Sequence, residues 1–97
     1  MKDDLLKTQE INKNTECKDL LSNSSMVISS CPNRILVMAF QNENNQIGEV
    51  KLKYIENQIF KIPSNGIYTR VIINQFLPVH IINIGINTIR ICFQYQG

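Results

Sequence analysis

The stretch LPVHIINIGINTIRICF, residues 77–93, decides the fold class. Isoleucine fills six of its seventeen positions, and β-branched residues favour strands. Ile89, Ile91 and Phe93 alternate with polar residues, a period of two that places the apolar side chains on one face of a strand. The segment NIGIN (83–87) sets a glycine between two asparagines, which predicts a turn. The stretch therefore predicts two strands joined by a tight turn.

Strand signals recur at short intervals in the residues before this stretch. They are MVIS, RILVMAF, GEVKLKYI, NQIFKIP and IYTRVII (residues 26–29, 34–40, 48–55, 57–63 and 67–73). RILVMAF is strongly apolar and is typical of a central strand, whereas GEVKLKYI alternates and predicts a strand with one exposed face. A hairpin is expected at Glu56–Asn57. The spacing predicts a mainly β fold, a small antiparallel β-sandwich or open barrel of five to seven strands.

The N-terminal residues differ in character from the rest of the chain. We expect residues 1–14 to be a flexible tail, because they are polar and charged. Thr15 is an N-cap residue type, and it predicts one short helix at about residues 15–21 with Leu20 and Leu21 docked on the sheet. Residues 15–97 would then form a single domain.

Length, charge and cysteine usage limit the function classes. A chain of 97 residues has room for one small domain, and its net charge of +2 does not by itself indicate a nucleic-acid or membrane partner. The N-terminus lacks a signal-peptide pattern and no apolar run reaches the roughly 20 residues of a membrane helix, so we expect a soluble intracellular protein. Cys17, Cys31 and Cys92 lack the paired spacing of a zinc site and are interpreted as thiols in a reducing compartment.

The candidate site residues are basic. His80 is the single histidine and has no carboxylate close to it in the sequence, so we expect no catalytic site. The basic residues of the strands are interpreted either as a solvated sheet face or as a surface for an anionic partner, which would be an acidic protein or a weakly bound nucleic acid. The candidate partner-binding residues are Lys51, Lys53, Arg70, His80 and Arg90.

The order of these segments resembles the PINIT domain of the PIAS/Siz family of SUMO ligases. RILVMAF is similar to the first strand of that domain, and EVKLKYIENQIFKIP (49–63) is similar to its hairpin. PVHII (78–82) stands where the family has P-I-N-I-T, and NTIRICF (87–93) resembles the strand after it. The residues that match this motif, with a structural role in the family, are Pro78, Val79, Ile81, Asn87 and Ile89.

The resemblance implies a substrate-recognition module for protein sumoylation, located in the nucleus. Its partners would be the protein to be modified and the SUMO-conjugating machinery. The module itself would carry no catalytic residue and no cofactor, since the family's ligase activity and zinc belong to an SP-RING that follows the PINIT domain. This sequence has no such RING segment, so either it is a piece of a longer ligase or its likeness to the family is architectural.

A jelly-roll module that binds a small ligand, of the galactose-binding kind, is the alternative. Its strands would also end in a hairpin of the form seen in GINTI (85–89). The absence of Trp counts against it, because such modules stack sugars on aromatic rings.

Overall fold

The computed structural model describes residues 15–96, and these form strands and turns without a helix. The strands are β1 (Glu16–Leu20), β2 (Ser25–Ile28), β3 (Cys31–Asn42), β4 (Gly48–Tyr54), β5 (Glu56–Ile62), β6 (Gly66–Gln75), β7 (Val79–Asn83) and β8 (Ile89–Gln96). The mainly β sandwich expected from the sequence is confirmed, with eight strands in place of five to seven. The tail predicted for residues 1–14 lies outside the described residues.

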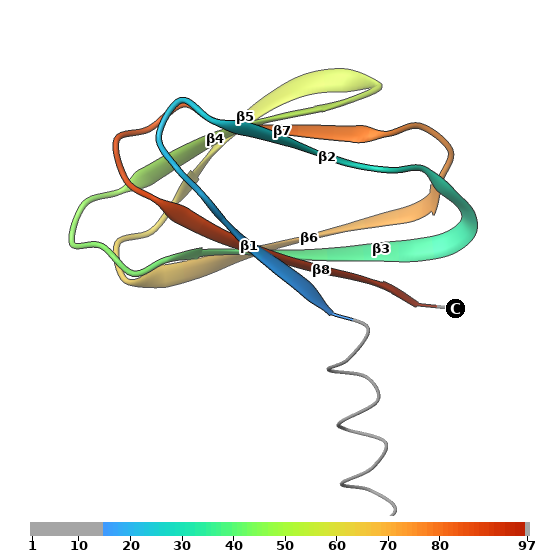
Figure 1. Ribbon diagram of the computed structural model, residues 1–97, viewed down its shortest axis with the longest axis horizontal. Coiled ribbons are helices and arrows are strands. Elements are labelled where there is room, and N and C mark those ends of the chain that lie inside the picture. Colours follow the sequence, from blue (N-terminus) through green and yellow to red (C-terminus); the bar gives the residue numbers. More distant parts are fainter. Residues whose placement is uncertain (1–14, 97) are drawn as a thin grey trace, which may run out of the picture.

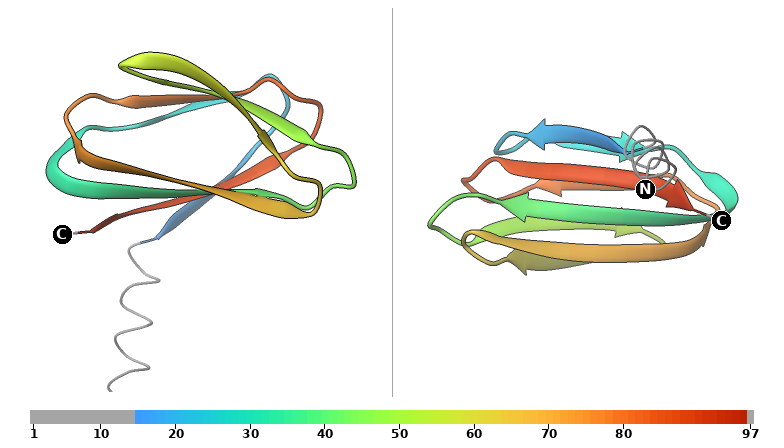
Figure 2. Two further views of the ribbon diagram at one scale, coloured as in Figure 1. Left: turned by 180° about the vertical axis from the view of Figure 1, so that it is seen from behind. Right: turned by 90° about the horizontal axis from the view of Figure 1, so that it is seen from below.

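The eight strands form two four-stranded antiparallel sheets. Sheet A has the order β1-β8-β3-β6 and sheet B the order β2-β7-β4-β5. The two sheets are the lower and upper layers of Figure 1. Between β1 and β8, every connection except the β4–β5 hairpin passes from one sheet to the other (Figure 2). Eight strands arranged in this way are a jelly roll, in effect one long hairpin with β4–β5 at its tip, rolled up so that β3 pairs with β6, β2 with β7 and β1 with β8.

The core lies between the two sheets and is built from every second residue of each strand. Leu36, Met38 and Phe40 of β3 are fully buried, as are Val50 of β4 and Ile81 of β7. The inner faces of β4 and β8 are those that the alternation predicts, because the apolar residues of the two strands point inward. Phe40 also contacts Phe60 of β5 and Tyr68 of β6, with ring centroids 5.1 and 6.2 Å away. These rings connect the two sheets near their β5 and β6 edges.

The helix predicted at residues 15–21 is wrong, because this segment is strand β1. It pairs with β8 from Glu16 opposite Phe93 to Leu20 opposite Ile89. Leu20 is buried as expected, whereas Leu21 is exposed. The local N-cap signal at Thr15 is outweighed by strand pairing with β8 and by the burial of Leu20, both of which are tertiary contacts.

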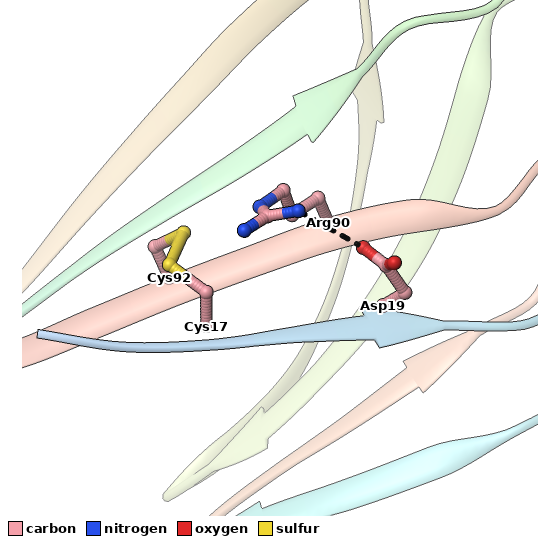
Figure 3. Close-up of polar contacts among 4 residues, drawn as sticks. All are labelled: Cys17, Asp19, Arg90 and Cys92. Carbon is pink, nitrogen blue, oxygen red and sulfur yellow. Dashed lines mark ion pairs between the residues drawn. A yellow bond between two sulfur atoms is a disulfide. The ribbon is translucent and has the colours of Figure 1, made fainter.

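The interpretation of the cysteines as free buried thiols is also wrong for two of the three. Cys17 and Cys92 are register partners on β1 and β8 and form a disulfide across the strands (Figure 3). Cys31 is the free cysteine among the described residues. The two bonded residues lie 75 positions apart in the sequence, so only the pairing of β1 with β8 reveals their proximity.

Asparagine occupies most of the left-handed backbone positions. Asn23, Asn33, Asn65 and Asn74 all have positive φ, a conformation that asparagine tolerates better than most residues. The fifth positive-φ residue is Ile55 (φ 61°), which alone separates β4 from β5. The β4–β5 hairpin is therefore confirmed, but it turns at Ile55 and not at Glu56–Asn57.

The segment NIGIN does form a turn, but it does not join a hairpin. It carries the chain from β7 in sheet B to β8 in sheet A. Asn83 is fully buried there: its Nδ2 donates hydrogen bonds to the carbonyls of Leu20 (2.8 Å) and Asn87 (2.6 Å), and its Oδ1 accepts one from Gly85 N–H (3.1 Å). A Cβ on Gly85 would lie 2.9 Å from the backbone nitrogen of Glu49, so this close approach requires glycine.

We expect Asn83→Ala to lower the free energy of unfolding by about 2–4 kcal/mol, because it removes the donor that the buried carbonyls of Leu20 and Asn87 use and leaves a cavity in its place. Urea unfolding of the full chain would measure the change. Asn45→Ala is the matched control, since Asn45 is exposed and accepts a single hydrogen bond, from Asn65. Its loss should stay within about 0.5 kcal/mol. Equal losses in the two variants would show that the Asn83 hydrogen bonds do not hold the turn.

Candidate functional site

Three of the five candidate basic residues meet on one surface. Lys51 and Lys53 of β4 alternate with the buried Val50 and Leu52, so they point away from the core. Lys53 is the register partner of His80 on β7, which is exposed on the same outer side of sheet B. Lys61 of β5 adds a further exposed cation there, opposite Glu49 of β4. We call Lys51, Lys53, Lys61 and His80 the basic face.

The other two candidates lie elsewhere. Arg70 of β6 is the register partner of the buried Met38 and is half-buried on the inner side of sheet A, near its free edge. Arg90 of β8 lies on the outer side of sheet A and pairs with Asp19 of β1 at 3.8 Å, next to the Cys17–Cys92 disulfide (Figure 3). Both side chains of this pair are well exposed, so it contributes little to stability. The five residues therefore do not form a single site.

The residues of the family motif are mostly part of the core. Val79 and Ile81 of β7 and Ile89 of β8 are fully buried, and Asn87 is buried with its Nδ2 donating to the carbonyl of Gln46 at 2.8 Å. Pro78 precedes β7 in the connection from β6. The motif thus shapes the crossover between the sheets, and Pro78 is its one exposed residue.

The outer side of sheet A carries an apolar patch that we did not predict. It comprises Ile35, Val37, Ala39, Ile67, Thr69, Val71 and Ile73, the outward residues of β3 and β6. Ile35 lies opposite Ile73, Val37 opposite Val71 and Ala39 opposite Thr69. Ile73 is 75% exposed. RILVMAF is apolar on both faces after Arg34, so its sequence does not show which face lies inward. In IYTRVII the charge of Arg70 favours the opposite, uncharged face as the inner one, and that face lies outward in the structure.

A polar depression of about 270 Å³ opens at one end of sheet A. Its lining consists of Asp19, Gln41, Glu43, Asn44, Thr88 and Arg90. These side chains offer hydrogen-bond donors and acceptors of the kind that small polar ligands use. A group of three or more His, Cys, Asp or Glu residues that could hold a metal ion is not found among residues 15–96.

Among residues 15–96, Tyr95 has a side chain whose pKa is clearly shifted. Burial raises the pKa of Tyr95 above its usual 10.0, and electrostatic interactions with Cys31 and Glu16 raise it further. Its O–H donates to the carbonyl of Ser29 at 2.6 Å, so the phenol anchors β8 to the connection between β2 and β3. This geometry gives Tyr95 a structural role.

Comparisons with known proteins include a distant structural likeness. No protein-family model matches the chain, and no curated protein is similar enough in sequence to match it. The solved structure of the Schizosaccharomyces pombe Cnp3 cupin domain is similar at 16% sequence identity and a TM-score of 0.47. The match covers 84% of this chain and 50% of the Cnp3 chain, so this chain spans about half the length of that structure. No helix with the length and hydrophobicity of a membrane span occurs between residues 15 and 96.

Proposed function

We propose that this chain is a protein-recognition module without a reaction of its own, and that its basic face binds an acidic surface or segment of a partner protein. The observation that supports this proposal is the gathering of Lys51, Lys53, Lys61 and His80 on the outer side of sheet B. Lys53 and His80 are neighbours on adjacent strands, which lie about 4.8 Å apart, and Lys51 is two residues from Lys53 on the same face. Lys61 lies farther along β5, opposite Glu49, and extends the face within reach of one partner. Charge complementarity of this kind raises association rates and selects partners.

The cellular setting follows from the resemblance to the PINIT domain. A module of that family would dock the protein to be sumoylated, in the nucleus, while the SP-RING of the full ligase would hold the zinc and engage the conjugating enzyme. The first partners to test are therefore SUMO and a SUMO-conjugating enzyme. Weak contact with nucleic acid through the same cations is part of this proposal, because phosphates attract such a face without sequence preference.

We expect the double variant Lys51→Glu/Lys53→Glu to weaken binding of the acidic partner by roughly tenfold or more, with the wild-type affinity falling as salt is added. The control is Lys18→Glu/Arg34→Glu, which changes the net charge equally but on strands β1 and β3 of sheet A. Titration calorimetry with SUMO and with the conjugating enzyme would measure both. Equal weakening by the two pairs of substitutions would disprove the basic-face site. If the wild type binds neither SUMO nor the conjugating enzyme, the proposed role in sumoylation is contradicted.

A small-ligand module of the galactose-binding kind is the second candidate. The jelly-roll strand order and the polar depression beside Arg90 favour it. Titrating galactose and other monosaccharides into the labelled protein should then shift the amide signals of Asn44, Thr88 and Arg90, and Asn44→Ala should reduce the response. If millimolar sugar leaves these signals in place, the depression is not a sugar site.

A further inference from the structure

The apolar patch on sheet A is a continuous run of uncharged outward residues on two adjacent strands. Between Ile35 and Ala39 on β3, and between Ile67 and Ile73 on β6, each outward residue is uncharged. Val71 and Ile73 are 52% and 75% exposed. Contiguous apolar surface of this kind marks a site of protein contact more often than a solvated face.

Strand β3 has the composition of a strand that is covered on both sides. Its inner residues Leu36, Met38 and Phe40 pack in the core, and its outer residues Ile35, Val37 and Ala39 are equally apolar. Strands that are buried on both faces have such continuous apolar runs, whereas half-exposed strands alternate, as β4 does. The described residues cover one side of β3 only. The outer side of β3 therefore lacks the covering layer that its apolar sequence favours.

We propose that a second copy of this chain supplies that layer, with the apolar patches of two molecules packed face to face across a two-fold axis. An isologous contact requires a self-complementary surface, and an uncharged patch centred on the Val37–Val71 pair meets this requirement without opposing like charges. The ion pair Asp19–Arg90 lies on β1 and β8, outside the patch. Two sheets packed in this way would interdigitate at about 10 Å, as the sheets of a sandwich do.

The size of the face fits a dimer. At a rise of about 3.4 Å per residue and a strand spacing of about 4.8 Å, the whole outer face of sheet A, eight positions long and four strands wide, outlines roughly 500 Å², and the patch on β3 and β6 makes up about half of it. Side chains corrugate this outline and increase its accessible area. A dimer that buries the patch at its centre and the polar residues of β8 and β1 at its rim thus approaches the roughly 600–1,000 Å² per partner that specific interfaces bury.

This arrangement leaves the basic face free. Sheet B lies on the opposite side of the sandwich from the patch, so the dimer would present two basic faces pointing away from each other (Figure 1). A partner with two acidic segments would then gain avidity from the pair. The dimer does not depend on the proposed function, because it uses another surface.

Sedimentation equilibrium of the full chain tests the proposal with one matched pair of variants. Val71→Lys introduces a charge at the centre of the patch, twice in each dimer, and should weaken self-association at least about 30-fold. Val27→Lys is the control, since Val27 is a valine of equal exposure (54%) on the outer side of β2 in sheet B. It should leave the dimer constant within about twofold. Circular dichroism would confirm that both variants are folded.

The outcomes separate the alternatives. A concentration-dependent dimer that Val71→Lys alone dissociates supports the proposal. A wild type that stays monomeric at every concentration overturns it. Equal weakening by Val71→Lys and Val27→Lys also overturns it. Each of these results leaves the calorimetric test of the basic face unaffected.

Discussion

Reduction of the Cys17–Cys92 disulfide is expected to lower the free energy of unfolding by about 2–4 kcal/mol, which is a fall of roughly 10–25 °C in Tm. The bond closes a loop that contains most of the chain, because its cysteines are 75 residues apart. If it acts by restricting the unfolded chain, a loop of this length gives about 4.5 kcal/mol as an upper value. Calorimetric melts with and without reductant would measure the change.

The cysteine variants make the test specific. Cys17→Ala, Cys92→Ala and the double variant should lose similar stability, since each breaks the same bond and the effects are therefore not additive. Cys31→Ala removes the free thiol, and its loss of Tm on reduction should be nearly the same as that of the wild type. Equal Tm values for oxidised and reduced wild type would show that the bond does not constrain the fold.

The disulfide also bears on the proposed nuclear setting. Cytosolic and nuclear thiols are kept reduced, and cross-strand bonds of this kind persist mainly in oxidising compartments. A nuclear role therefore requires that the reduced protein stays folded at physiological temperature. The same melts decide this point, because a reduced protein that is unfolded under those conditions would contradict the nuclear proposal.

Phe40→Ala is expected to cost about 3–5 kcal/mol, and Tm should fall by at least about 12 °C. Phe40 is fully buried, and its ring joins β3 of sheet A to Phe60 of sheet B. Phe60 itself stacks on Tyr68 with centroids 4.3 Å apart, so removal of Phe40 leaves a cavity beside two rings that hold each other in place.

Phe76→Ala provides the matched control for the core. Phe76 is 56% exposed and contacts Tyr54 with ring centroids 5.8 Å apart, so its removal should cost about 1 kcal/mol. Urea unfolding of both variants gives the comparison. If Phe40→Ala costs no more than Phe76→Ala, then the two sheets do not close around Phe40.

Alternation within single strands could be predicted from the sequence. The inner faces of β4 and β8 follow from a period of two, which depends only on local geometry. The pairing of strands could not be predicted, because β1 meets β8 and β2 meets β7 across most of the chain. That missing information explains the error at residues 15–21: without β8 as a partner, a segment with an N-cap residue reads as a helix.

The same limit applies to the candidate surfaces. Lys51 and Lys53 were grouped correctly, since they share one strand face, and His80 joins them through the pairing of β7 with β4. Arg70 was misplaced because its charge makes its own face of IYTRVII look like the outward one, whereas the opposite face is uncharged. Once the Met38–Arg70 register is known, Arg70 turns inward and Val71 turns outward. The apolar patch follows from that register alone.

Solvent exposure of individual methyl groups in the native full chain is the most direct test of the two outer faces. A soluble paramagnetic agent broadens methyl NMR signals in proportion to their exposure. We expect the methyls of Val71 and Ile73 to be protected at concentrations where the dimer forms, while those of Val27 and Ile59 on sheet B are broadened as their exposures of 54% and 60% require. Broadening of all four residues in proportion to their exposure in the single chain, at every concentration, would contradict a covered apolar patch.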